Sequence, residues 1–215
     1  MINRKVTVID YGVGNILSVT RALQQFGADV SIASSNAEIR KSTRVVLPGV
    51  GAFPNAMRSL TRLSIVETIT EMSGNGTPIL GICLGMQLLF EESYELNPTS
   101  GLCLIPGFVE RIQKEAGLEK FIKVPHIGWS EIHRPPEGRE WKNTILQNVE
   151  DKSSAYFVHS YGCIPRERVD VLAVTKYCDL EIIAAVQREN VMGCQFHPEK
   201  SGETGLKILE SFIKL

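Results

Sequence analysis

The sequence has 215 residues, a formal net charge of −1 at pH 7, 43% hydrophobic residues and 22% charged residues. A chain of this kind can bury a sizeable core, while its charge balance offers no electrostatic attraction to nucleic acid or to an anionic membrane. No apolar stretch approaches the ~20 residues that span a bilayer, and charged residues interrupt any N-terminal signal peptide. The five cysteines are odd in number and contain no C-x-x-C pair, so we expect a reducing, cytoplasmic location and no metal site.

The first half of the chain predicts strands that alternate with helices. We expect short apolar strands at 5–10, 28–33, 44–47 and 78–83. Helical spacing of apolar residues predicts helices at 16–26 and around 65–72, and a short helical piece is expected around 37–40. This alternation favours a mostly parallel sheet with helices on both faces.

The second half predicts strands joined by short turns. We expect strands at 107–112, 129–133, 155–159, 169–177, 180–188 and 191–196, and a closing helix at 204–215. Asp179 and the pair Glu189-Asn190 fall at turn positions, so antiparallel hairpins are expected there. No repeat or linker divides the chain, and residues 1–215 are therefore interpreted as one α/β domain with added antiparallel strands.

A cysteine between two glycines, in the segment Gly81-Ile82-Cys83-Leu84-Gly85, follows a buried apolar run and precedes helical spacing. The pattern G-x-C-x-G is the thiol form of the nucleophile elbow, a sharp turn from strand to helix that exposes the nucleophile. Most free cysteines are instead buried core residues. From this segment alone, the nucleophile and the core interpretation of Cys83 both remain open.

A cysteine nucleophile needs a base, and the base needs a group that orients it. His197 follows a predicted strand in the segment Phe196-His197-Pro198-Glu199, and Glu199 is close enough to accept a proton from its ring. The alternative is a surface turn with a solvated ion pair. The elbow favours the catalytic interpretation, in which His197 lowers the pKa of Cys83.

Attack on a carbonyl also needs hydrogen-bond donors for the developing oxyanion. The backbone N–H of Leu84, directly after Cys83, is one candidate. The loop Pro48-Gly49-Val50-Gly51 is the second, because it follows a strand and should lie on the same rim of the sheet. The same loop must also serve as an ordinary turn from strand to helix.

Together, the segments around Cys83, around His197 and Glu199, and at 48–51 resemble the class I (triad) glutamine amidotransferases over nearly the whole chain. Segments 10–15, 125–129 and 156–161 further resemble the glutaminase subunits of imidazole glycerol phosphate synthases. The resemblance implies a flavodoxin-like α/β fold and a chain that hydrolyses L-glutamine without a cofactor, through a glutamyl thioester. It also implies transfer of the ammonia to a separate (βα)₈-barrel cyclase subunit, for histidine biosynthesis.

The resemblance also implies roles for further residues. Oxyanion donors would be the amides of Val50 and Leu84. Glutamine would be held by Gly51, Gln87, Glu95, His159, Ser160 and Tyr161. Four residues would lie toward the cyclase or the ammonia channel: Tyr11, Asn15, His126 and Trp129. By composition alone, Glu95 is equally an exposed carboxylate at a helix end, and His126 and Trp129 are equally packing residues.

Three alternatives remain at this point. Ser130, Gly162 and Gly202 depart from the usual pattern of these subunits, which leaves room for a paralogue that supplies ammonia for amidation of a bacterial surface sugar. A stand-alone cysteine hydrolase of the same fold is the second. A nucleotide-binding domain built on the glycines at 12 and 14 is disfavoured, because Leu17 occupies the third glycine position of that motif.

Overall fold

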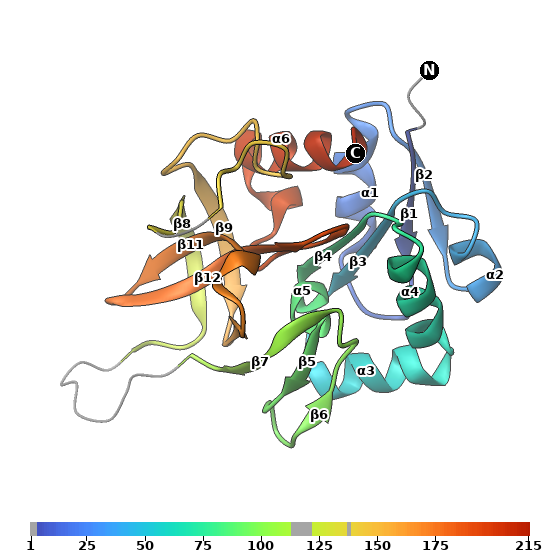
Figure 1. Ribbon diagram of the computed structural model, residues 1–215, viewed down its shortest axis with the longest axis horizontal. Helices are drawn as coiled ribbons and strands as arrows, with labels where there is room; N and C mark the ends of the chain where they lie inside the picture. The colour runs from blue at the N-terminus through green and yellow to red at the C-terminus, as the bar shows by residue number, and fades with distance from the viewer. Residues whose placement is uncertain (1–3, 113–121, 137–138) are drawn as a thin grey trace.

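The computed structural model describes residues 4–112, 122–136 and 139–215. Among these residues, nine strands form a central sheet in the order β2-β1-β3-β4-β13-β12-β11-β8-β9 (Figure 1). The parallel strands are β1 (Lys5–Ile9), β2 (Asp29–Ala33), β3 (Val45–Gly49), β4 (Ile79–Cys83) and β13 (Val191–Cys194). The antiparallel part contains β8 (His126–His133), β9 (Ser154–His159), β11 (Val171–Tyr177) and β12 (Leu180–Arg188). The predicted mostly parallel sheet with later antiparallel strands is confirmed.

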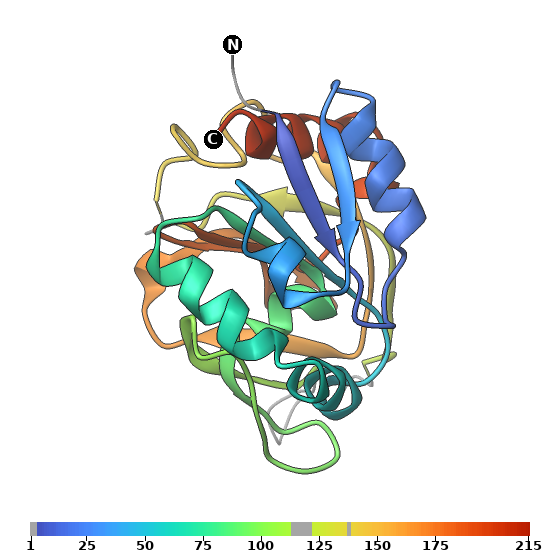
Figure 2. The same ribbon diagram turned by 90° about the vertical axis from the view of Figure 1, so that its right-hand side faces the viewer.

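Helices cover both faces of the parallel part (Figure 2). One face carries α1 (Ile16–Gln24) and α6 (Gly202–Ile213). The other carries α2 (Asn36–Ile39), α3 (Phe53–Arg62), α4 (Ile65–Gly74) and α5 (Leu84–Leu88). Alternation along the strands divides the core accordingly, since Leu80 and Ile82 pack toward α1 and α6 while Ile79 packs on the opposite face.

A second sheet lies beside the first and was not predicted as such. Its order in the described chain is β10-β7-β5-β6, formed by β5 (Phe90–Ser93), β6 (Thr99–Ser100), β7 (Ile105–Arg111) and β10 (Tyr161–Pro165). The helical spacing after Cys83 lasts only to Leu88, and the backbone enters β5 at Phe90. Helix α3 was also missed, although Phe53, Ala56 and Leu60 lie on one helical face and are buried.

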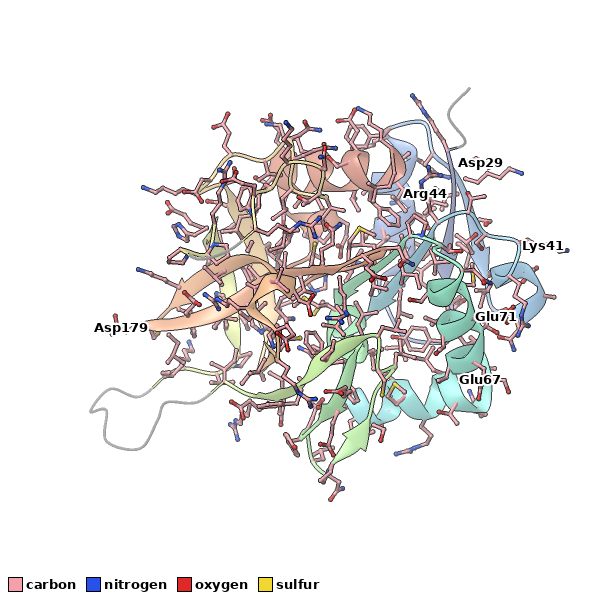
Figure 3. The ribbon with its side chains drawn as sticks, viewed as in Figure 1. Asp29, Lys41, Arg44, Glu67, Glu71 and Asp179 are labelled. Carbon is pink, nitrogen blue, oxygen red and sulfur yellow. The ribbon has the colours of Figure 1, made fainter. Side chains whose placement is uncertain are left out.

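The two predicted hairpins form. Strands β11 and β12 pair antiparallel around Cys178 and Asp179, whose φ angles of 48° and 68° suit a tight turn. Asp179 lies at the tip of this hairpin, on the left-hand side of the view (Figure 3). Strands β12 and β13 turn at Glu189, which has a φ of 51°.

Across the described ranges, no helix is both long and apolar enough to cross a membrane.

The carboxyl ends of β3, β4 and β13 lie next to one another in the sheet. Gly49 at the end of β3 pairs with Cys83 at the end of β4, and Cys194 at the end of β13 pairs with Ile82. The segments that leave these three strands therefore emerge at a common edge. In open parallel sheets, ligands bind at this edge.

Candidate active site

Cys83 occupies a strained corner between β4 and α5. Its φ and ψ angles are 55° and −112°, a combination that residues with a side chain rarely adopt. The flanking glycines allow this corner, because a Cβ atom on Gly81 would lie 2.5 Å from the carbonyl oxygen of Gly85, and one on Gly85 would overlap the carbonyl oxygen of Leu47. The geometry is that of a nucleophile elbow.

The backbone of His197 is fixed from both sides. Its N–H donates to the carbonyl of Tyr156 in β9 at 3.0 Å, and its carbonyl accepts from the hydroxyl of Ser201 at 2.7 Å. The Ser201 hydroxyl oxygen in turn accepts the N–H of Tyr156 at 3.0 Å. The segment after β13 is thus tied to β9 before α6 begins.

The imidazole of His197 is held by Glu199. The Nδ1 of His197 lies 2.8 Å from Oε1 of Glu199, and the two side chains are only 3% and 1% exposed. Because the carboxylate accepts from Nδ1–H, Nε2 is left for another partner. This Nε2 is buried and has no hydrogen-bond partner in the described residues, so it is available to a reacting group in the cavity.

The electrostatics of His197 favour its charged form. Burial lowers the pKa of the ring, but Cys83 and Glu199 outweigh this effect and raise it to about 9. An imidazolium at neutral pH is the partner that stabilises a nearby thiolate. Residues far apart in the sequence thus come together: Glu199 holds Nδ1 of the ring, and Cys83 lines the same cavity as His197.

A cavity of about 390 Å³ opens beside Cys83 and His197. Of the residues proposed to bind glutamine or the oxyanion, all line it: Val50, Gly51, Leu84, Gln87, Glu95, His159, Ser160 and Tyr161. Pro125 and Val158 also line the cavity, and nothing in the sequence indicated a role for either side chain.

Within residues 4–112, 122–136 and 139–215, no three His, Cys, Asp or Glu side chains group to hold a metal ion.

Gln87 and Glu95 are both engaged in the structure. The Nε2 of Gln87 donates to the carbonyl of Tyr161 and to Oε1 of Gln195, both at 3.0 Å. Oε2 of Glu95 accepts the N–H of Phe53 at the start of α3 at 2.7 Å, where a carboxylate is favourable. Each side chain therefore has one oxygen, Oε1, that takes no part in these hydrogen bonds.

Gln195 lies beside Cys83 and was not singled out from the sequence. Its side chain is fully buried, accepts from Gln87 through Oε1, and places Nε2 3.9 Å from Sγ of Cys83. The feature of the sequence that could have identified Gln195 is its position directly before Phe196 and His197, just after β13 ends at Cys194. A buried amide at a strand end needs partners, and here they are two residues of the candidate site.

The four residues expected to face a cyclase or a channel lie in different environments. Trp129 is 58% exposed on β8, and Asn15 is half-buried. Tyr11 and His126 are buried, so their side chains are not on the surface. The hydroxyl of Tyr11 donates to the carbonyl of Pro48 at 2.9 Å and so anchors the loop that precedes Val50. Burial and the charge of Cys83 raise the pKa of Tyr11, which keeps this donor protonated.

Comparison with known proteins agrees with this geometry. The family model for class-I glutamine amidotransferases matches residues 7–215. Imidazole glycerol phosphate synthase subunit HisH 1 of Legionella pneumophila (strain Lens) is 46% identical over 210 residues, covering 98% of this chain and 99% of that protein. The HisH subunit of Moorella thermoacetica is 43% identical, covering 99% of this chain and 95% of that protein.

Among solved structures, PurLQS from Thermotoga maritima matches with a TM-score of 0.72 and 22% identity, over 98% of this chain and 97% of the matched chain. This identity supports the fold alone. The family match and the relatives go further, because they extend over nearly the full length of both sequences. The chain belongs to the class-I glutamine amidotransferase family and, within it, to the HisH subunits of imidazole glycerol phosphate synthase.

Proposed function

We propose that this chain hydrolyses L-glutamine with Cys83, His197 and Glu199, and that a separate cyclase subunit of imidazole glycerol phosphate synthase uses the ammonia in histidine biosynthesis. One observation carries the proposal. The strained elbow of Cys83, the His197–Glu199 pair at 2.8 Å and the candidate glutamine ligands surround one cavity. Membership of the HisH subunits supports the identity of the partner.

The first half-reaction forms a thioester. The Sγ thiolate of Cys83 attacks the side-chain amide carbon of glutamine, and the carbonyl oxygen takes up the negative charge. The N–H groups of Leu84 and Val50 stabilise this oxyanion, an effect worth ~2.7–4 kcal/mol per donor. The C–N bond then breaks as Nε2–H of His197 protonates the departing nitrogen, which releases ammonia and leaves neutral imidazole.

The second half-reaction returns the enzyme to its starting state. Neutral His197 takes a proton from a water molecule, and the hydroxide adds to the thioester carbon at the same oxyanion site. The C–S bond breaks, glutamate leaves, and Cys83 is again a thiolate beside imidazolium. Glu199 acts throughout by holding Nδ1–H, so its role is to orient and stabilise His197.

Glutamine recognition follows from the oxygens that the cavity leaves available. Oε1 of Glu95 is suited to the α-ammonium group of the substrate, because opposite charges attract strongly in a partly enclosed cavity. Oε1 of Gln87 accepts a further N–H, and Gly51 together with Ser160 and Tyr161 supplies polar backbone around the substrate. The cavity volume of about 390 Å³ leaves room for an amino acid of this size.

The surface on β8 is suited to a protein partner. Ile127 and Trp129 point to the same side of the strand and are 57% and 58% exposed. Exposed aromatic and aliphatic side chains that lie side by side are typical of a protein interface. Ammonia released into neutral water becomes ammonium and is no longer a nucleophile, so a closed path to the second active site serves the reaction.

Ammonia transfer tests the proposal directly. The chain is mixed with the histidine-pathway cyclase subunit from the same genome and its nucleotide substrate, and product is measured with glutamine as the nitrogen source. We expect glutamine-dependent product, and more glutamate formed with the occupied cyclase than without it. High glutaminase turnover in the chain alone would support a stand-alone hydrolase. Glutaminase activity without transfer to this cyclase would support the surface-sugar paralogue.

The proposed role of Glu199 predicts a specific change with pH. Activity requires protonated His197, so kcat/KM should fall as pH rises through the pKa of about 9. Glu199→Gln removes one of the two groups that raise this pKa. The alkaline limb should therefore move to lower pH, with a ~10–100-fold loss of maximal activity, as expected for losing one hydrogen bond to a charged group.

The matched control is Glu203→Gln, the same chemical change at an exposed residue of α6 that pairs with Lys207. It should leave the pH profile of kcat/KM unchanged. An alkaline limb at the same pH in Glu199→Gln and in the wild type would refute the assignment of Glu199.

A further inference from the structure

A continuous series of side-chain hydrogen bonds runs beneath the cavity from β8. The hydroxyl of Ser130 lies 2.9 Å from Nε2 of His126. Nδ1 of His126 lies 3.0 Å from Nε2 of His159, and Nδ1 of His159 lies 2.8 Å from the carbonyl oxygen of Tyr161. His126 and His159 are brought together because they are directly paired across β8 and β9.

The direction of these hydrogen bonds follows from the carbonyl at one end. A carbonyl oxygen only accepts, so His159 must carry its proton on Nδ1. In a neutral ring, Nε2 of His159 then accepts, and His126 must donate from its own Nδ1. Nε2 of His126 is thereby an acceptor as well, and it needs the O–H of Ser130. One arrangement of protons satisfies every atom.

The surroundings keep both rings neutral. His126 is 1% exposed and stacks on Tyr177 and Phe157 with ring centroids 4.1 and 4.8 Å apart. Burial lowers the pKa of His126 to about 4. Burial also lowers the pKa of His159 to about 4, which its hydrogen bond to Tyr161 only partly opposes, and the charges of His126 and His197 add to the decrease. Each ring therefore has one donor and one acceptor at neutral pH.

The series continues to the nucleophile. The carbonyl of Tyr161 that accepts from His159 also accepts from Nε2 of Gln87, at 3.0 Å. The same Nε2 donates to Gln195, whose own Nε2 lies 3.9 Å from Sγ of Cys83. Tyr161 and Gln87 line the cavity, whereas His126 and Ser130 do not.

We propose that His126 and Ser130 are positioning residues for glutamine, which act by fixing the tautomer of His159 and, through it, the carbonyl of Tyr161 and the amide of Gln87. This proposal rests on the proposed glutaminase function of the same cavity. If His159 carried its proton on Nε2, a lone pair on Nδ1 would face the carbonyl oxygen of Tyr161. Two acceptors would then repel, and the wall of the cavity that carries Gln87 would shift.

The test compares variants of equal size that differ in hydrogen bonding. His126→Asn places an amide N–H near the position of Nδ1, whereas His126→Leu has the same shape without a donor. At the outer end, Ser130→Thr keeps the hydroxyl and Ser130→Val replaces it with a methyl group. All four are made in the Cys83→Ala background, so that L-glutamine binds without reacting. Two quantities are measured: the tautomer of His159 by ¹⁵N NMR, and the Kd of L-glutamine by calorimetry.

We expect His126→Asn and Ser130→Thr to keep the Nδ1–H tautomer of His159 and a Kd within about threefold of the Cys83→Ala parent. His126→Leu should shift His159 toward the Nε2–H tautomer and weaken glutamine binding by about tenfold, the effect of leaving one buried polar group unsatisfied. Ser130→Val should act in the same direction with a smaller change, because the half-buried Ser130 site admits water.

Two results would overturn the proposal. One is equal weakening of glutamine binding by His126→Asn and His126→Leu, which would mean that ring size and not hydrogen bonding matters. The other is an unchanged His159 tautomer and Kd in His126→Leu. The proposed function fails in a distinguishable way: the Cys83→Ala parent would then not bind L-glutamine at all, while the NMR measurement would still report the tautomer of His159.

Discussion

Replacing Cys83 with alanine is expected to abolish glutamine-dependent product formation, by at least about 10⁴-fold, as for removal of other triad nucleophiles. In the proposed mechanism the sulfur of Cys83 bonds to the substrate carbon, and among the described residues that line the cavity no other carries a thiol. The same variant, mixed with the cyclase subunit, should still form product from added ammonium salt, because this source of ammonia bypasses Cys83.

Cys178→Ala is the matched control for this prediction. Cys178 is an exposed thiol at the turn between β11 and β12, so its loss should leave glutamine-dependent turnover unchanged. Retained ammonium-dependent product formation with Cys83→Ala shows that the cyclase itself is active in the assay, so the loss is specific to the use of glutamine. Glutamine-dependent activity in Cys83→Ala close to that of the wild type would exclude Cys83 as the nucleophile, and with it the proposed thioester.

The parts of the site that sequence reasoning reached are those fixed by local backbone rules. A cysteine between two glycines after an apolar run can form only a few kinds of turn, and the structure contains the strained elbow at Cys83. His197 and Glu199 are two residues apart, so their contact at 2.8 Å needs little knowledge of the fold. Parallel strands then bring both segments to one edge, which follows from the predicted alternation of strands and helices.

The parts that sequence reasoning missed depend on contacts between distant segments. The pairing of His126 with His159 requires the register of β8 and β9, which no local pattern specifies. Gln87 was expected to face the substrate, yet its Nε2 is used internally by Tyr161 and Gln195. Gln87 and Tyr161 are 74 positions apart in the sequence, and Gln87 and Gln195 are 108 positions apart, so no local pattern predicts these contacts.

The second sheet was missed for a different reason. Residues 84–89 are apolar at helical spacing, and nothing in their composition marks a helix end at Leu88. The backbone enters β5 because Phe90 pairs with Ile105 of β7, a contact that propensity alone does not encode. Tyr11 is a similar case, since its burial depends on the carbonyl of Pro48 in another strand.

Gly85→Ala should have the largest effect on stability among substitutions near the site. Gly85 lies in α5, where its backbone contacts β3 so closely that a Cβ atom would overlap the carbonyl oxygen of Leu47. Because the atom of Leu47 that the Cβ would meet belongs to the backbone, no side chain can move away to make room. We expect the free energy of unfolding, measured with urea, to fall by about 3 kcal/mol or more.

Gly74→Ala separates this steric effect from the general effect of replacing a glycine in a helix. Gly74 ends α4, is exposed, and has no atom within 4 Å of a Cβ position. There, alanine should raise the free energy of unfolding by ~0.5–1 kcal/mol. If Gly85→Ala unfolded at the same urea concentration as the wild type, α5 would not be pressed against β3. The position of Cys83, which begins that helix, would then lose its structural explanation.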